Sequence, residues 1–291
     1  MEKVYLDHNA TTPTHPEVIK AMQPYFREIY GNASSLHRFG QHARKAVEEA
    51  REQVALFIGA QPDEIVFTSG GTEADNFAVK GVAYAVAKKR GHIITSSIEH
   101  HAVLNPCKYL EKKGFNVTYL PVDRYGLIDP DNVKKAIKKS TILVSIMYAN
   151  NEVGTVQPIK EIGEVLKEVN IRRSASNIPQ VYFHTDAVQA VGRIPVNVRE
   201  LNVDLLSLSG HKIYGPKGIG ALYVRKRTKI EALLHGGHHE KNRRAGTENV
   251  PGITGLGKAV ELAREGMEKE NRRVRRLRDK LREGIFERIG Q

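Results

Sequence analysis

A lysine that follows an apolar run is the residue of this sequence best suited to covalent chemistry. Lys212 lies in the stretch VDLLSLSGHKIYGPKGIG (203–220), just after apolar residues that stop at Ser209 and Gly210. Such a run is typical of a buried strand. A lysine at its end is partly desolvated, loses its proton at low cost and can condense with a carbonyl group. Taken alone, the pattern fits a solvated loop charge better, so other residues must support the chemistry.

A turn of small residues suits a phosphate group. The sequence Ser69-Gly70-Gly71-Thr72-Glu73 follows an apolar run at 65–68 and opens a predicted helix. Free backbone N–H groups, the positive end of the helix dipole and the Thr72 hydroxyl all favour an anion there. An ordinary capped helix explains the turn equally well, since threonine is a good cap.

Polar side chains also follow three further predicted strands. His100 follows one strand, Asn150 and Asn151 follow a second, and Asp186 with Gln189 follows a third. His100 could stack on an aromatic ligand, although a surface histidine is the commoner explanation. The two amides suit a ring substituent or simply a turn. A carboxylate such as that of Asp186 at the end of a buried strand is costly unless a cation or a strong donor pairs with it.

Together these positions match the parts of pyridoxal 5′-phosphate (PLP). They offer a phosphate turn, a ring stacker, an acid for a ring nitrogen and a lysine for an aldehyde. In PLP enzymes the carboxylate keeps the pyridinium protonated, so that the ring withdraws electrons from the substrate.

The elements that must position these residues alternate along the chain. Strands are predicted at 65–68, 92–96, 116–120, 141–147, 181–185, 203–208 and 219–224. Stretches of helical periodicity separate most of them, which predicts an α/β fold with a mostly parallel sheet and helices on both faces. Only about ten residues join the last two strands, too few for a crossover helix, so one antiparallel strand is expected. A short strand at 4–6 and a polar surface excursion at 171–179 are also expected.

Composition limits the functional classes. The 291 residues include 40% hydrophobic and 27% charged residues, values typical of a soluble globular protein. Without an apolar membrane span or a signal-like start, a cytoplasmic protein is expected. The net charge is +12, but the sequence contains no basic motif interleaved with aromatic residues. We therefore expect anionic ligands or an acidic partner rather than nucleic acid.

The last predicted helix, near 253–289, carries an apolar stripe. The stripe consists of Val274, Leu277, Leu281, Ile285 and Ile289. Such a stripe normally packs against something. Either it docks on the domain already described, or its natural partner is missing.

The sequence resembles the NifS/IscS-like cysteine desulfurases of the class V aminotransferases, over nearly all its length. The resemblance rests on the segments YLDHNATTP, GNASSLHRFG, FTSGGTEADN, EHHAVL, NNEVGTVQP, YFHTDAVQAVG, SLSGHKIYGPKGIGALYVR and RAGTENV. It implies a PLP-dependent, aspartate aminotransferase-like large domain with a seven-stranded sheet. The implied reaction takes sulfur from L-cysteine, leaving alanine and a persulfide that feeds iron-sulfur cluster assembly.

The resemblance also implies roles for individual residues. Lys212 would bond the cofactor aldehyde, Asp186 would face the pyridine nitrogen, Gln189 the phenolic oxygen, and His100 would stack on the ring, with Lys212 or His100 as candidate bases. The remaining implied cofactor contacts are the phosphate-binding Gly71, Thr72, Ser209 and His211, and Asn151 near the ring or substrate. Thr247 would reach the phosphate of the neighbouring subunit, so a homodimer is implied, with an iron-sulfur scaffold protein as partner.

The sequence departs from the family in three ways. Members are usually longer, and the implied division is a segment near the active site (1–15), a PLP-binding domain (16–256) and a helix (257–291) leading to a missing small domain. The mobile loop with its cysteine nucleophile and the substrate-clamping arginine are absent, and Cys107, at helical spacing from Val103 and Leu110, is expected to pack as a small hydrophobe. His235, His238 and His239 are expected to lie in a loop near the dimer interface rather than to bind a metal.

Two alternative functions stay open. One is a related class V lyase or aminotransferase, and the other is a non-catalytic cofactor-binding remnant that docks a partner.

Overall fold

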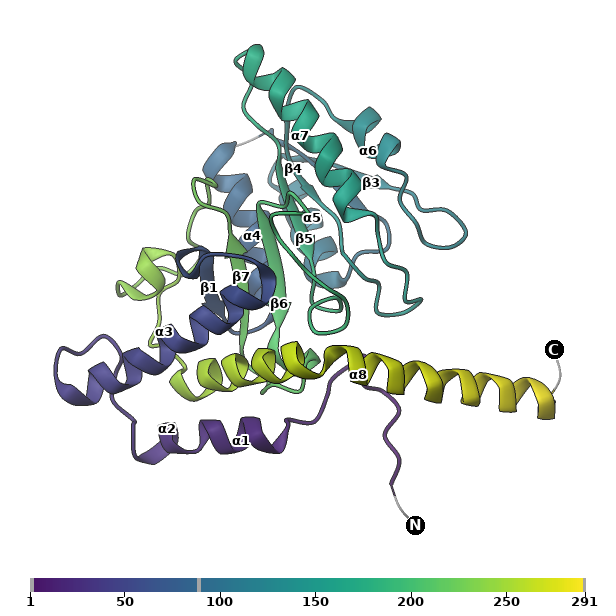
Figure 1. Cartoon of the computed structure of the whole chain (residues 1–291). Helices are drawn as coiled ribbons and strands as arrows, with labels where there is room; N and C mark the ends of the chain where they lie inside the picture. Colours follow the sequence, from purple (N-terminus) through teal and green to yellow (C-terminus); the bar gives the residue numbers. More distant parts are fainter. Residues whose placement is uncertain (1–2, 88–89, 290–291) are drawn as a thin grey trace.

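A computed structural model describes residues 3–87 and 90–289 of the chain (Figure 1). Within these residues seven strands form one sheet in the order β1-β7-β6-β5-β4-β2-β3. The strands are β1 (Ile65–Thr68), β2 (His92–Ser96), β3 (Asn116–Leu120), β4 (Thr141–Ser145), β5 (Tyr182–Asp186), β6 (Leu205–Ser209) and β7 (Gly220–Val224). β7 pairs antiparallel with β6 and with β1, and the other neighbours are parallel. The predicted sheet and its antiparallel strand are confirmed.

Helices cover both faces of the sheet. They are α1 (Pro16–Met22), α2 (Pro24–Arg27), α3 (Arg38–Ile58), α4 (Gly71–Val86), α5 (His101–Lys112), α6 (Pro130–Ala136), α7 (Ile159–Ala175) and α8 (Val250–Ile289), with short 3-10 helices η1 (Pro62–Glu64), η2 (Gly210–Lys212) and η3 (His239–Asn242). The buried side chains form two clusters, one under α4 and α5 and the other under α3, α6, α7 and the start of α8. Each face of the sheet therefore has its own core.

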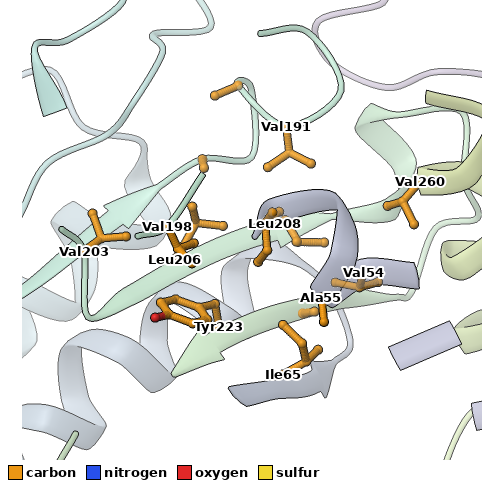
Figure 2. Packing of buried hydrophobic residues seen from close by; sticks show 14 of the residues in the cluster. Val54, Ala55, Ile65, Val191, Val198, Val203, Leu206, Leu208, Tyr223 and Val260 are labelled. Carbon is orange, nitrogen blue, oxygen red and sulfur yellow. The ribbon is translucent and has the colours of Figure 1, made fainter. Parts of the chain in front are cut away.

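The strands supply both cores because neighbouring side chains point to opposite faces. In β6, Leu205 belongs to the α4–α5 cluster and Leu206 to the other. Figure 2 shows the second cluster, which contains Leu206 and Tyr223 of the sheet together with Val54 and Ala55 of α3. Burial on both faces explains why these strands read as continuous apolar runs instead of alternating ones.

One local prediction is wrong and another holds only in part. The expected strand at 4–6 does not form, and Val4, Tyr5 and Leu6 are exposed. The expected surface excursion at 171–179 is mostly exposed, but it is helical as far as Ala175, the end of α7. There the Arg173 guanidinium is buried and donates to the carbonyl oxygens of Lys138, Lys139, Thr141 and Pro179. This arginine fixes the end of α7 to the loop before β4. The sequence did not predict this role, because Arg173 lies among polar residues that are typical of a surface loop.

Helix α8 is buried only at its start. Its residues from Val250 to Val260 include much of one core, whereas the predicted stripe is 41% exposed at Val274 and 79% exposed at Ile289. In Figure 1 the helix runs on past the sheet towards the C-terminus. The alternative in which the stripe docks on the described domain is therefore wrong.

Candidate functional site

One cavity of about 640 Å³ collects the predicted site residues at the carboxyl ends of the parallel strands. Its lining includes Gly71, Thr72, His100, Asn151, Asp186, Gln189, Ser209, His211 and Lys212. Ligands of open α/β sheets bind at this edge. Thr247 is exposed and does not line this cavity.

Lys212 lies in η2, directly after β6. Its Nζ donates hydrogen bonds to the carbonyl oxygens of Ala10, at 2.9 Å, and Asn9. Burial lowers the pKa of Lys212, and the positive Arg193 lowers it further, although Asp186 and Asp7 act in the opposite direction. A lowered pKa increases the fraction of neutral amine, the form that attacks a carbonyl.

Asp186 ends β5 and is buried. Its Oδ1 accepts a 2.9 Å hydrogen bond from the Val188 N–H. Burial raises its pKa, while that hydrogen bond and the positive charge of Lys212 favour the charged form. A buried carboxylate of this kind suits a ring nitrogen that carries a proton.

The predicted phosphate turn has the geometry of an anion site. Gly70 has φ +150°, in the region that favours glycine, and no side chain caps α4 at this residue. The Ser209 Oγ is buried and, among the described residues, has no hydrogen-bond partner. This oxygen lies 3.9 Å from where a Cβ on Gly70 would stand. An uncapped helix start facing an unsatisfied hydroxyl fits the phosphate of PLP.

Three further predicted residues line the cavity and form hydrogen bonds within the chain. His100 is the N-cap of α5, its Nδ1 accepting from Ala102 N at 3.1 Å. Gln189 Nε2 donates to the Asn9 carbonyl at 2.9 Å. Asn151 lines the cavity, whereas Asn150 Oδ1 accepts from the N–H groups of Glu152 and Val153. Of the two adjacent amides, Asn150 is thus a turn residue.

The N-terminal turn was predicted only to lie near the active site, without named residues. Asp7, Asn9 and Ala10 line the cavity. The turn is tied to η2, because the N–H and hydroxyl of Thr12 both donate to the His211 carbonyl. Sequence reasoning missed these contacts because backbone carbonyls leave no signal in residue types.

A buried polar cluster under the cavity was also missed. His184 Nδ1 lies 2.8 Å from Ser145 Oγ, and its Nε2 lies 3.0 Å from Ser207 Oγ and 3.6 Å from Asp75 Oδ1. Burial lowers the pKa of His184 to about 3, so the imidazole is neutral and does not compensate the carboxyl of Asp75. The sequence does contain one signal for this cluster, because Asp75 lies on the apolar face of its helix, beside Ala74 and Ala78.

Both Asp75 and a second carboxyl near it favour their neutral forms. Burial raises the pKa of Asp75 well above its usual value, and the charge of Asp186 raises it further. Burial likewise raises the pKa of Glu99 to about 8, against hydrogen bonds from Ser96 and from the Met147 N–H. Asp186, the carboxyl beside Lys212 and His100, is therefore the best placed of the three to hold a negative charge at neutral pH.

Cys107 is fully buried on α5, as predicted. Burial raises the pKa of its thiol to about 12, so the thiolate is scarce at neutral pH. His238 Nδ1 lies 2.6 Å from Asn242 Oδ1, and His239 Nδ1 accepts from Gly246 N at 3.3 Å. Within residues 3–87 and 90–289, no group of three His, Cys, Asp or Glu side chains is placed to hold a metal.

Comparisons with known proteins agree with this geometry. The model of the family described as aminotransferase class V matches residues 4–290. A cysteine desulfurase IscS of Dictyoglomus turgidum is 60% identical over 99% of this chain and 70% of its own length. An IscS of Methanosarcina thermophila is 58% identical over 97% of this chain and 68% of its own length.

Solved structures give the same result. A NifS-like protein superposes with a TM-score of 0.93 at 43% identity, covering 98% of this chain and 76% of that one. A structure described as SspA in complex with cysteine gives a TM-score of 0.84 at 46% identity, over 89% of this chain and 72% of that one. The chain therefore belongs to the class V aminotransferase family, among the IscS- and NifS-like cysteine desulfurases.

Proposed function

We propose that this chain is a PLP-dependent cysteine desulfurase that removes sulfur from L-cysteine. The observation that carries the proposal is that one cavity brings Lys212 and Asp186 together with the unsatisfied Ser209 hydroxyl and the uncapped start of α4. When bound, PLP supplies an electron-withdrawing ring that weakens the bonds at the substrate's alpha carbon. Relatives named for this activity support the choice of substrate.

The chain's own residues divide the work. Gly71, Thr72, Ser209 and His211 would hold the phosphate, and His100 would cover the ring. Asp186 would hold a proton on the ring nitrogen, and Gln189 would donate to the phenolic oxygen. Lys212, released from the carbonyls of Asn9 and Ala10, would bind the aldehyde and then move a proton at the alpha carbon, with His100 as the other candidate base.

Sulfur transfer needs a thiol other than Cys107. This residue is the one cysteine of the sequence, and its thiol is buried in the α4–α5 core. The sulfur acceptor is therefore a thiol that this sequence does not supply. In an assay, an added small thiol would take that place.

The first test is the visible absorption spectrum of the chain with PLP, followed by L-cysteine and dithiothreitol. We expect a cofactor band that Lys212→Ala lacks and that L-cysteine shifts, with alanine and sulfide formed together. Turnover of another amino acid without sulfide from L-cysteine would favour a related class V lyase or aminotransferase. A band with no turnover of any amino acid would favour a cofactor-binding remnant. A Lys212→Ala chain that still gave a borohydride-trapped adduct would refute the role of Lys212.

We further infer a homodimer in which Thr247 completes the phosphate site of the second copy. Support comes from the exposure of Thr247 and its place outside its own cavity. Mixing Lys212→Ala and Thr247→Ala chains tests this, because a mixed dimer contains one intact site. Activity should rise above that of either variant alone, and no rise would argue against a shared site.

An iron-sulfur scaffold protein with an acidic surface is the partner we propose, since the net charge is +12. Binding to such a scaffold should weaken as salt concentration rises.

The division into segments 1–15, 16–256 and 257–291 and the cytoplasmic location stay predictions. Among the described helices, none has the length and apolar character needed to cross a membrane.

A further inference from the structure

A charged pair lies at the start of α4, beside the phosphate turn. Glu73, in the first turn of the helix, accepts a 2.8 Å hydrogen bond from the Ser69 N–H through Oε2. Arg244 binds the same carboxylate in a fork, with Nε 2.8 Å from Oε1 and a terminal nitrogen 3.2 Å from Oε2. Both side chains are largely buried, 23% exposed for Arg244 and 19% for Glu73.

The loop that carries Arg244 is held in a strained conformation. Glu240, Lys241 and Asn242 have φ of +46°, +57° and +65°, in the left-handed region that non-glycine residues seldom adopt. Such a conformation persists only where the surroundings determine it. Contacts with residues outside the loop must therefore hold this conformation.

Glu240 supplies that fixation. Its carboxylate forms two 2.8 Å hydrogen bonds with the buried Arg51 guanidinium, and it also accepts from the Phe67 N–H at 2.8 Å. Phe67 belongs to β1, which ends at Thr68 just before the phosphate turn. The loop thus contacts the surroundings of the phosphate turn at two places. Glu240 binds to β1, which precedes the turn, and Arg244 binds Glu73 at its end.

The position of Glu73 creates an electrostatic conflict. Its carboxylate shapes the turn through Ser69, but it places a negative charge at the helix end where a phosphate dianion must bind. Although burial favours the neutral form of Glu73, hydrogen bonds from Arg244 and Ser69 hold its pKa below the usual value. The charge therefore stays, and a cation must compensate it before a second anion can bind closely.

We propose that Arg244 is a positioning residue for the phosphate end of the cofactor, which cancels the charge of Glu73 while Glu73 keeps the turn in shape. This inference rests on the proposed function, because the anion in question is the phosphate of PLP. Arg244 acts through Glu73, and the strained loop fixed by Glu240 holds its guanidinium in place.

The test compares a ligand with and without phosphate, independently of covalent bonding to Lys212. Calorimetry measures the affinity of the purified chain for pyridoxamine 5′-phosphate and for pyridoxamine. In Arg244→Met we expect the phosphorylated ligand to bind about tenfold more weakly, because Glu73 is left uncompensated, with little change for pyridoxamine. The matched control is Arg243→Met, which removes a charge from the same loop at a residue that donates to the Asp63 carbonyl instead.

A double variant separates charge compensation from loop support. Gln at position 73 keeps an acceptor for the Ser69 N–H without the charge, so Glu73→Gln with Arg244→Met should restore the preference for the phosphorylated ligand. Loss of affinity for both ligands alike, or no recovery in the double variant, would overturn the role of Arg244. Should Arg244→Met not fold, Glu73→Gln alone decides, because it should keep or raise the preference, and a lowered preference contradicts the proposal. A native chain that bound both ligands equally would instead count against the proposed function.

Discussion

At the scale of single residues, the site is notable for its uncompensated buried carboxyls. Asp75 lines the cavity, yet its nearest basic group is the neutral ring of His184. Its neighbours in the fold are Asp186 and Ser207 in the sheet, with Glu99 before α5. A carboxyl in such surroundings is more stable as an acid than as an anion.

This arrangement predicts a pH-dependent effect of Asp75→Asn. Because the pKa of Asp75 is higher in the folded chain than in the unfolded one, the folded chain binds more protons, and the free energy of unfolding falls as pH rises above about 4. Asparagine does not titrate. The variant should therefore gain stability over the native chain between about pH 5 and pH 8, by at most about 1.4 kcal/mol per pH unit. Urea unfolding of the cofactor-free chain at both pH values measures this, with the exposed Glu287→Gln as control, and a difference that does not change with pH would contradict it.

Lys212 gives a second prediction at this scale. Its Nζ is held by two backbone carbonyls of the N-terminal turn, so the free amine is oriented before any ligand arrives. Lys212→Arg keeps a donor for those carbonyls but cannot lose its proton near neutral pH. We expect stability close to that of the native chain and no covalent adduct with PLP after borohydride reduction, measured by mass spectrometry. An adduct at another lysine would show that the orientation of Lys212 is not required.

At the scale of elements, the close crossing of α3 and α8 holds the second core together. A Cβ on Gly257 of α8 would come within 2.8 Å of the Ala50 Cα of α3. Gly266 lies on the same helix with nothing within 4 Å of such an atom. One helix thus carries two glycines in opposite surroundings.

The pair makes a matched prediction. Gly257→Ala should destabilise the chain by about 1 to 3 kcal/mol, because the helices must move apart. Gly266→Ala should stabilise it by about 0.5 to 1 kcal/mol, because alanine favours a helix interior. Thermal unfolding of both variants checks the signs, and equal shifts would mean that the crossing is not the constraint.

The elements also show what a sequence can and cannot predict. Apolar runs located the strands to within about two residues, because the central strands of a doubly covered sheet are buried on both faces. The rule that strand ends carry ligands singled out Thr72, His100, Asn151, Asp186 and Gln189. The family resemblance added the other phosphate-binding residues, and nine of the ten predicted cofactor-binding residues line the cavity. Arg173 and Glu240 were missed because their partners are backbone groups or distant residues, which no local pattern records.

At the scale of the whole molecule, the stripe of α8 is an apolar surface left exposed on a long helix. Leu277 is 47% exposed and Leu281 is 60% exposed. Apolar surfaces of this kind promote association. We expect the chain to associate increasingly with concentration, and Leu281→Glu to reduce this more than the neighbouring Arg282→Glu, as measured by sedimentation velocity. Equal effects of the two variants would assign the association to charge.

The contact between the N-terminal turn and η2 also bears on the order of folding. The Thr12 N–H meets the His211 carbonyl, and about two hundred residues separate them along the chain. Contacts between such distant residues form late, because closing the intervening loop costs entropy first. During synthesis, the phosphate turn and His100 leave the ribosome well before Lys212 does. The lysine and the turn that orients it therefore complete the cavity last, so a nascent chain cannot capture its cofactor covalently until most of the sheet has been made.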